Sequence, residues 1–278
     1  MGVIHYQAPK RLLSVARGHP YERDAYAALC DGLEEFDTCL VEQPAAANLM
    51  GPDLSTEYDA LLCYDMPGVD FTAGPEAVPV APPESFRSRY LAMLEAGIGV
   101  VYLHHSIAAW PAWERYAEII GGRFHYRPAS LRGVDYPDSG YRHKVSHRLS
   151  VLADHPVTAG LPESFEMVDE LYLCPLLTDS FTPLLASDYA FNMDNFYSAA
   201  KAVAGEMNTR DGWSHPEGAN SVAWVKAWGS SPIVYIQGGD DGEAMANPHF
   251  QQLVHNAVRW VASDEAHSWA RQQQGSSS

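Results

Sequence analysis

Short apolar runs alternate with segments of helical periodicity along the first hundred residues of the chain. The segments 21–33 and 85–95 place apolar residues at helical spacing. The runs before and after them, each five or six residues long, are 11–16, 36–41, 60–64 and 98–103. Near-continuous apolar strands separated by helices are typical of a parallel sheet covered on both faces. We therefore predict an α/β fold with a doubly wound, mostly parallel sheet.

The second half of the chain has a less regular pattern. Its predicted strands are 147–152, 165–168, 183–186, 222–227 and 233–237. An amphipathic helix at 247–262 closes the domain, so residues 1–262 are predicted to form one unit. The stretch 189–218 is rich in aromatic residues, Asn and Gly, and it is either a surface excursion or a lid. The polar tail 263–278 is expected to fray.

The charge of the chain limits its partners. It has 18 Lys and Arg residues against 35 Asp and Glu, a formal net charge of -17. Such a surface repels phosphate backbones and anionic lipids, so neither nucleic acid nor a membrane is an expected partner. A small neutral carbohydrate suits this charge better than a polyanion. Because no run reaches membrane-spanning length and no apolar signal region opens the chain, we expect a cytoplasmic location.

Four segments of the chain carry motifs of a known family, in order and with sensible spacing. They read GHPYERDAYAALCDGL, GVVYLHHSIAAWPAWERYAEIIGGRF, ADHPVTAGLPESFEMVDELY, and SVAWVKAWG followed by IVYIQGGDDGEAMANPHFQQLVHNAVRWVA. Together they resemble the ThuA-like (trehalose utilisation) branch of the class I glutamine amidotransferase-like fold over residues 10–262. The resemblance implies a flavodoxin-like sheet and a role in carbohydrate metabolism.

The chain departs from the amidotransferase pattern at one position and from the ThuA-like pattern at another. In class I amidotransferases, the turn after the strongest strand carries the nucleophilic Cys, whereas here it reads Leu103-His104-His105-Ser106. Glutamine hydrolysis is therefore not expected. Related sequences commonly have Gly-His after the last strand, where this chain has Asp240. Any role of that imidazole must have changed or been lost.

The candidate catalytic residues follow predicted strands, because ligands bind outside the carboxyl ends of the strands in an open parallel sheet. His19 follows the first strand, His104 the strongest, and Asp240 the last. Glu170 follows the strand at 165–168 and is the favoured acid or base. We expect the positive end of a helix dipole to keep His104 neutral, so that it can accept a proton.

Further residues are predicted to contact the substrate. They are His105, Asp169, Tyr172, Trp110 and Trp213. Aromatic faces suit the C–H surface of a sugar, and Trp213 lies in the insertion as a lid candidate. Asp169 and Glu170 are adjacent, so only one of them faces a ligand if the strand continues, and Asp169 would then fix a loop. The alternate spacing of His143 and His147 places both on one strand face.

The sequence leaves three functions open. The first is an enzyme that isomerises, eliminates from or hydrolyses a neutral glycoside or keto sugar by His/carboxylate acid–base chemistry. The second is a non-catalytic sugar-binding or assembly protein. The third is a metal-dependent hydrolase, with His19, His104, Glu170 and Asp240 as ligands suited to zinc. The oligomeric state stays open, and a homo-oligomer is compatible with the sequence.

Overall fold

Five parallel strands form the centre of the protein in a computed structural model that describes residues 7–275. The strands are β2 (Phe36–Glu42), β1 (Lys10–Arg17), β3 (Ala60–Asp65), β6 (Gly99–Leu103) and β14 (Ser231–Ile236), in this spatial order. Neighbouring strands run parallel throughout this part of the sheet. Every residue of β3, β6 and β14 is buried, as their apolar sequences predict for strands covered on both faces.

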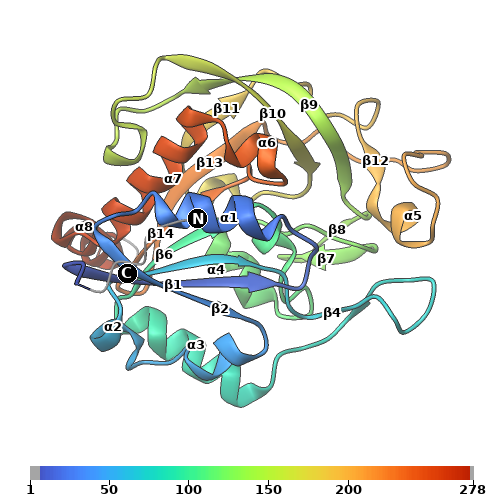
Figure 1. Ribbon diagram of the computed structural model, residues 1–278. Coiled ribbons are helices and arrows are strands. Elements are labelled where there is room, and N and C mark those ends of the chain that lie inside the picture. The colour runs from blue at the N-terminus through green and yellow to red at the C-terminus, as the bar shows by residue number, and fades with distance from the viewer. Residues whose placement is uncertain (1–6, 276–278) are drawn as a thin grey trace.

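Four antiparallel strands extend the same sheet beyond β14 (Figure 1). They are β13 (Ser221–Trp228), β11 (Thr182–Ser187), β9 (Gly140–Val151) and β10 (Ser164–Leu173). The short β12 (Tyr197–Ser198) pairs with β9. Both β9 and β10 are longer than predicted, because the added segments 140–146 and 169–173 are rich in polar and aromatic residues and lack a continuous apolar run. Two small ribbons, β4–β5 (Val69–Asp70, Val78–Pro79) and β7–β8 (Ala129–Leu131, Val134–Tyr136), lie outside this sheet.

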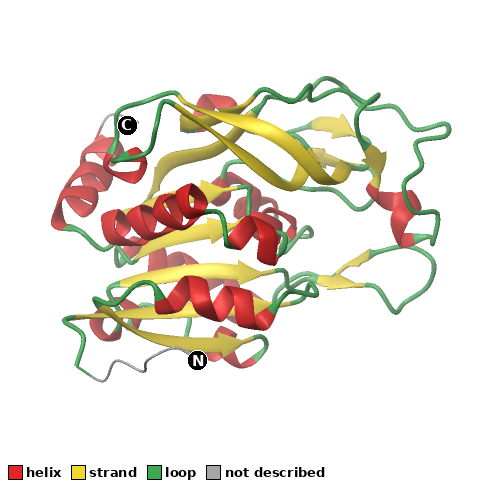
Figure 2. Ribbon diagram, turned by 45° about the horizontal axis from the view of Figure 1, so that its top comes forward, coloured by secondary structure: helices red, strands yellow, loops and turns green. Residues whose placement is uncertain are grey.

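Helices cover both faces of the sheet, and each face has its own hydrophobic core (Figure 2). One face packs against α1 (Arg23–Asp31), α6 (Gly242–Met245) and α7 (Pro248–Val261). The other packs against α2 (Leu54–Glu57), α3 (Glu84–Glu95) and α4 (Glu114–Ile120). Besides the C-terminal helix α8 (Asp264–Gly275), the other helices within the described residues are α5 (Ala199–Val203), η1 (Ala45–Asn48), η2 (His104–Ala108), η3 (Pro156–Thr158) and η4 (Thr178–Ser180). No helix within the described residues is long and apolar enough to cross a bilayer.

The polar tail is helical, so the expectation that it frays is wrong for its described part. Helix α8 spans Asp264–Gly275. Ala266 and Ala270, one helical turn apart, are fully buried, and the ring of Trp269 lies 5.3 Å from that of Trp260 in α7. Three apolar side chains among many polar ones therefore anchor this helix. Residues 276–278 lie outside the described part of the chain.

We expect His147 in β9 to make folding stability depend on pH. The side chain is buried, with its Nδ1 atom 2.8 Å from Ser187 Oγ, and burial lowers the pKa of His147 to about 4. An unfolded histidine has a pKa of about 6.5. The unfolded chain therefore takes up a proton that the folded chain rejects, and stability is lost as the pH falls from 6.5 to 4. The expected loss from this group is about 3 kcal/mol.

Urea denaturation at pH 7 and pH 4.5 tests this expectation. The variant His147→Asn should lose less stability on acidification than the wild type. Arg148→Gln, in the same strand and without ionisation in this range, should behave like the wild type. Equal acid sensitivity of His147→Asn and the wild type would contradict the assignment.

Candidate active site

His104 is the centre of a buried polar cluster at the carboxyl end of β6. Its φ of 46° lies in the left-handed region, and such strain in a non-glycine residue often marks a functional turn. The Nδ1 atom lies 2.7 Å from the backbone oxygen of Gln237. A carbonyl oxygen only accepts hydrogen bonds, so Nδ1 carries a proton. The other ring nitrogen, Nε2, is thereby directed at the side chains of the site.

Three side chains converge on the Nε2 atom of His104. Tyr172 Oη lies 2.7 Å away, Glu170 Oε2 lies 3.2 Å away, and Asp240 Oδ1 lies 3.5 Å away. Glu170 and Tyr172 share one face of β10 because they are two residues apart in a continuous strand. Asp240 enters from the loop after β14. The predicted catalytic residues His104, Glu170 and Asp240 therefore meet in one cluster.

A β-bulge brings His143 into this cluster. In the β9–β10 pairing, Val145 lies opposite Asp169 and Arg142 lies opposite Leu171, so both His143 and Lys144 oppose Glu170. Lys144 has a φ of 53°, which marks the irregular position of the bulge. The Nδ1 atom of His143 consequently lies 3.3 Å from Glu170 Oε1 and 3.7 Å from Asp240 Oδ2.

The same bulge separates His143 from His147, so the prediction that both share one face is wrong. Tyr141 packs in the core that contains Tyr172, whereas Val145 packs in the core on the opposite face of the sheet. The extra residue of a bulge shifts the alternation by one position. His147 therefore lies on the other face, away from the cluster.

Asp169 fixes the loop that carries Asp240. It does not line the cavity in front of Glu170 that is described below. Its carboxylate accepts hydrogen bonds from the backbone N–H groups of Gly239 at 2.7 Å, Asp240 at 3.1 Å and Glu170 at 2.8 Å. The predicted substrate contact of Asp169 is therefore corrected to the alternative loop-fixing role. Burial raises the pKa of Asp169 to about 7, while the positive charge on His104 and the three N–H donors oppose this rise.

The charge of His104 differs from the sequence-based expectation. Burial alone lowers the pKa of His104, but the carboxylates of Asp240 and Glu170 outweigh burial and raise the pKa well above its usual value. Burial raises the pKa of Asp240, but its hydrogen bonds to His104 and His143 lower that pKa by more. The expected neutral imidazole is wrong because η2 is a single short turn, and two adjacent carboxylates dominate its dipole.

His19 and His105 form a pair of rings beside His104. Their rings stack with centroids 4.8 Å apart. His105 is buried, and its Nε2 atom donates to the backbone oxygen of Tyr64 at 3.1 Å, while its Nδ1 atom has no partner among the described residues. His105 does not line the cavity, so the structure gives it no substrate contact. His19 does line the cavity, and its Nδ1 atom bonds to the backbone oxygen of Pro20 at 2.8 Å.

A cavity of about 410 Å³ opens in front of Glu170, Tyr172 and His143, a size suited to a small-molecule ligand. The insertion 189–218 supplies part of its wall through four side chains: Ala199, Ala202, Val203 and Met207. No sequence motif indicated the aromatic lining from Phe71, Phe124, Tyr126 and Tyr141. Phe71, Phe124 and Tyr126 lie in loops, and Tyr141 lies at the start of β9, so no periodic pattern marks these residues.

The two predicted stacking tryptophans do not line this cavity. The ring of Trp110 packs 5.2 Å from that of Phe86. Trp213 is buried, and its Nε1 atom donates to the backbone oxygen of Asp138 at 3.0 Å. The insertion therefore contributes small and aliphatic side chains to the cavity in place of an indole.

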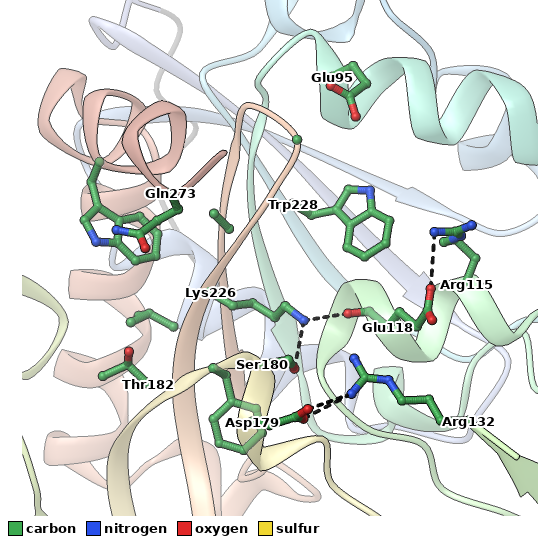
Figure 3. A pocket seen from close by; sticks show the side chains of 15 residues that line it. Glu95, Arg115, Glu118, Arg132, Asp179, Ser180, Thr182, Lys226, Trp228 and Gln273 are labelled. Atoms are coloured by element: carbon green, nitrogen blue, oxygen red, sulfur yellow. Dashed lines mark hydrogen bonds and ion pairs between the residues drawn. The ribbon is translucent and has the colours of Figure 1, made fainter. Parts of the chain in front are cut away.

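A larger groove of about 850 Å³ lies at the opposite edge of the sheet, near the β13–β14 turn (Figure 3). Lys226 is buried there, and its Nζ atom donates to the backbone oxygen of Glu118 at 2.5 Å and to Ser180 Oγ at 3.2 Å. Burial lowers the pKa of Lys226 to about 8. Arg132 pairs with Asp179 at 3.1 Å. Lys226 is thus satisfied by two neutral oxygens and Arg132 by a carboxylate, and the groove lies away from the carboxyl ends of the parallel strands.

The strand order defines a doubly wound, mostly parallel α/β fold with helices on both faces, as in solved ThuA-like structures, and the turn after β6 carries two histidines and no cysteine. The chain belongs to the ThuA family, described as trehalose utilisation, whose model matches residues 53–261. This match confirms the predicted family and its carbohydrate-related role. No curated protein matches the chain significantly.

Solved structures share this fold at low sequence identity. A protein described as ThuA-like from Parabacteroides merdae is 17% identical, with 92% of this chain and 90% of that chain covered and a TM-score of 0.63. A ThuA-like protein from Bacteroides uniformis is 16% identical, with 94% of each chain covered and a TM-score of 0.61. A cytoplasmic protein from Salmonella typhimurium is 10% identical, with 91% and 98% covered and a TM-score of 0.52. These likenesses establish the fold.

Proposed function

We propose that the protein is an enzyme that acts on a neutral glycoside or keto sugar by acid–base chemistry. One observation carries this proposal: an oriented imidazole, two carboxylates and a tyrosine hydroxyl converge within hydrogen-bonding reach beside a ligand-sized cavity. The description of the family, trehalose utilisation, supports a sugar as the substrate. General acids and bases must lie within such reach of the protons that they transfer.

The cluster is suited to removing a proton from carbon beside a carbonyl group. Glu170 lines the cavity, and its carboxylate can accept the C2 proton of a 3-keto glycoside. The C–H electron pair then forms the enolate, whose oxygen accepts hydrogen bonds from His104 or Tyr172. Collapse of the enolate forms the C1–C2 double bond and breaks the bond to the anomeric oxygen. His143 donates the proton that the departing oxygen needs. The outcome is elimination; reprotonation at carbon instead gives isomerisation.

Proton NMR in deuterated water tests the proposal. Purified protein is incubated with trehalose, with its 3-keto derivative and with methyl 3-keto-glucoside. We expect the keto sugars to exchange the proton beside the carbonyl and then to release the anomeric substituent, whereas trehalose itself stays unchanged. If folded, metal-supplemented protein neither exchanges nor converts any of these sugars, the enzymatic proposal fails, and a sugar-binding role takes its place.

A metal-dependent hydrolase is a second candidate, favoured by the geometry of the same cluster. Ligand atoms of His104, Glu170 and Asp240 all lie within 4.8 Å of one another. The Nδ1–H group of His104 donates to a backbone carbonyl, as is usual for metal-bound histidines. One imidazole and two carboxylates suit zinc or a similar divalent ion. His19, the fourth ligand suggested by the sequence, is not in this converging group.

Metal analysis separates the two candidates. If the site holds zinc, dialysed protein should retain about one equivalent per chain. His104→Ala should lose this metal, and His215→Ala, which alters a buried histidine outside the cavity, should keep it. If chelator-treated protein keeps full activity but holds less than a tenth of an equivalent of metal per chain, the metal-dependent mechanism is excluded.

A further inference from the structure

We infer that the substrate is a glycoside whose aglycone is apolar, aromatic or alicyclic, and that this aglycone binds at the outer end of the cavity. The inference rests on the proposed function, because it assigns the sugar to the inner end beside Glu170 and His143. It goes beyond the trehalose that the family description names. A disaccharide is polar at both ends, whereas this cavity is polar at one end only.

A continuous row of aromatic rings leads from the cavity mouth to His104. Phe71 is 40% exposed, and its ring meets that of Tyr126 edge-on at 5.1 Å. Tyr126 lies 5.1 Å from Phe124, and Phe124 lies 4.7 Å from Tyr172. Tyr172 then stacks on His104 at 4.8 Å. The row therefore forms one wall of the cavity from solvent to the acid–base cluster.

Aliphatic side chains of the insertion contribute the rest of the apolar lining. Ala199, Ala202 and Val203 come from α5, and Met207 follows this helix in the chain. Met207 is 54% exposed, the highest value among the large hydrophobic side chains of the described residues. Phe71 and Met207 thus expose apolar surface at the rim of a cavity, which is a common property of ligand sites.

The tyrosine hydroxyls of the cavity already have partners within the protein. Tyr126 Oη donates to Met66 Sδ at 3.3 Å. Tyr141 Oη accepts from the backbone N–H of Asn208 at 2.9 Å and donates to Met207 Sδ at 3.8 Å. The outer part of the cavity therefore presents aromatic rings, with few free hydrogen-bonding groups, to a ligand.

This distribution favours an apolar aglycone over a second sugar. A second sugar would bring several hydroxyl groups against rings and methyl groups, and each buried hydroxyl without a partner costs free energy. A phenyl or alicyclic group would instead remove apolar surface from water on both sides of the contact. The polar lining residues His19, His143 and Glu170 remain available to the hydroxyls of the first sugar.

Calorimetric binding and steady-state kinetics with a matched pair of substrates test the inference. The pair is phenyl and methyl 3-keto-glucoside, which differ only in the aglycone. We expect wild-type protein to bind the phenyl compound at least about tenfold more tightly. The double variant Phe71→Ser/Met207→Ser should reduce this ratio to near one by weakening the binding of the phenyl compound. Val134→Ser, at a 52% exposed position outside the cavity, should keep the wild-type ratio.

The outcomes distinguish the two proposals. Equal affinity of wild-type protein for both compounds, or a tenfold ratio that persists in the double variant, would overturn the aglycone inference even if both compounds are converted. A phenyl preference that disappears in the double variant, without conversion of either compound by wild-type protein, would overturn the proposed reaction and retain the apolar subsite.

Discussion

Replacement of His104 by alanine is expected to lower keto-sugar turnover by about a thousandfold, the upper range for loss of a hydrogen-bond donor to a developing oxyanion. Three contacts of its Nε2 atom disappear together: those with Tyr172, Glu170 and Asp240. The variant also removes the only imidazole that touches the Tyr172 hydroxyl within the described chain. Initial rates with saturating methyl 3-keto-glucoside measure the effect.

Two further variants control for unfolding. His104→Asn keeps a side-chain donor for the backbone oxygen of Gln237 but has no second donor at the place of Nε2, so it should be equally inactive and remain folded. His215→Ala changes another buried histidine, which lies outside the cavity, and should retain activity. If His104→Asn, folded by circular dichroism, keeps more than a tenth of wild-type turnover, His104 does not stabilise the enolate.

Replacement of Asp169 by alanine is expected to destabilise the fold by about 3 kcal/mol and to lower turnover at least about tenfold. The change leaves the buried N–H groups of Gly239, Asp240 and Glu170 without their acceptor. The loop would then no longer hold Asp240 beside His104. Urea denaturation measures the loss of stability. Initial rates measure how far turnover depends on the position of Asp240 beside His104.

The control for Asp169 lies on the same strand. Glu166→Ala removes an exposed carboxylate that pairs with Arg148 at 2.8 Å, and such surface pairs contribute little. This variant should stay within about 0.5 kcal/mol of the wild type and retain activity. A stable and active Asp169→Ala protein would show that the loop keeps its conformation without the carboxylate.

Local sequence pattern was sufficient for the central sheet and for part of the site. The apolar runs of β1, β3 and β6 indicate buried parallel strands, because a strand covered on both faces needs apolar residues at successive positions. Parallel topology then places residues that follow such strands at one edge. His19, His104 and Asp240 were predicted on this ground, and all three lie at that edge.

The pairing of β9 with β10 could not be predicted from either strand alone. The bulge at Lys144 is a property of two strands in register, and it decides that His143 faces Glu170 while His147 faces the opposite core. The role of Asp169 likewise depends on backbone N–H groups of Gly239 and Asp240, about seventy residues away in the chain.

The sequence by itself determined the alternation of strands and helices, the family, and the edge of the sheet where chemistry is placed. These features follow from local periodicity and from motifs read along the chain. Only the tertiary structure decided the charge of His104, because its pKa depends on two carboxylates that come from distant segments. The aromatic row from Phe71 to Tyr172 is also a tertiary feature, since its rings come from three segments that have no common sequence pattern.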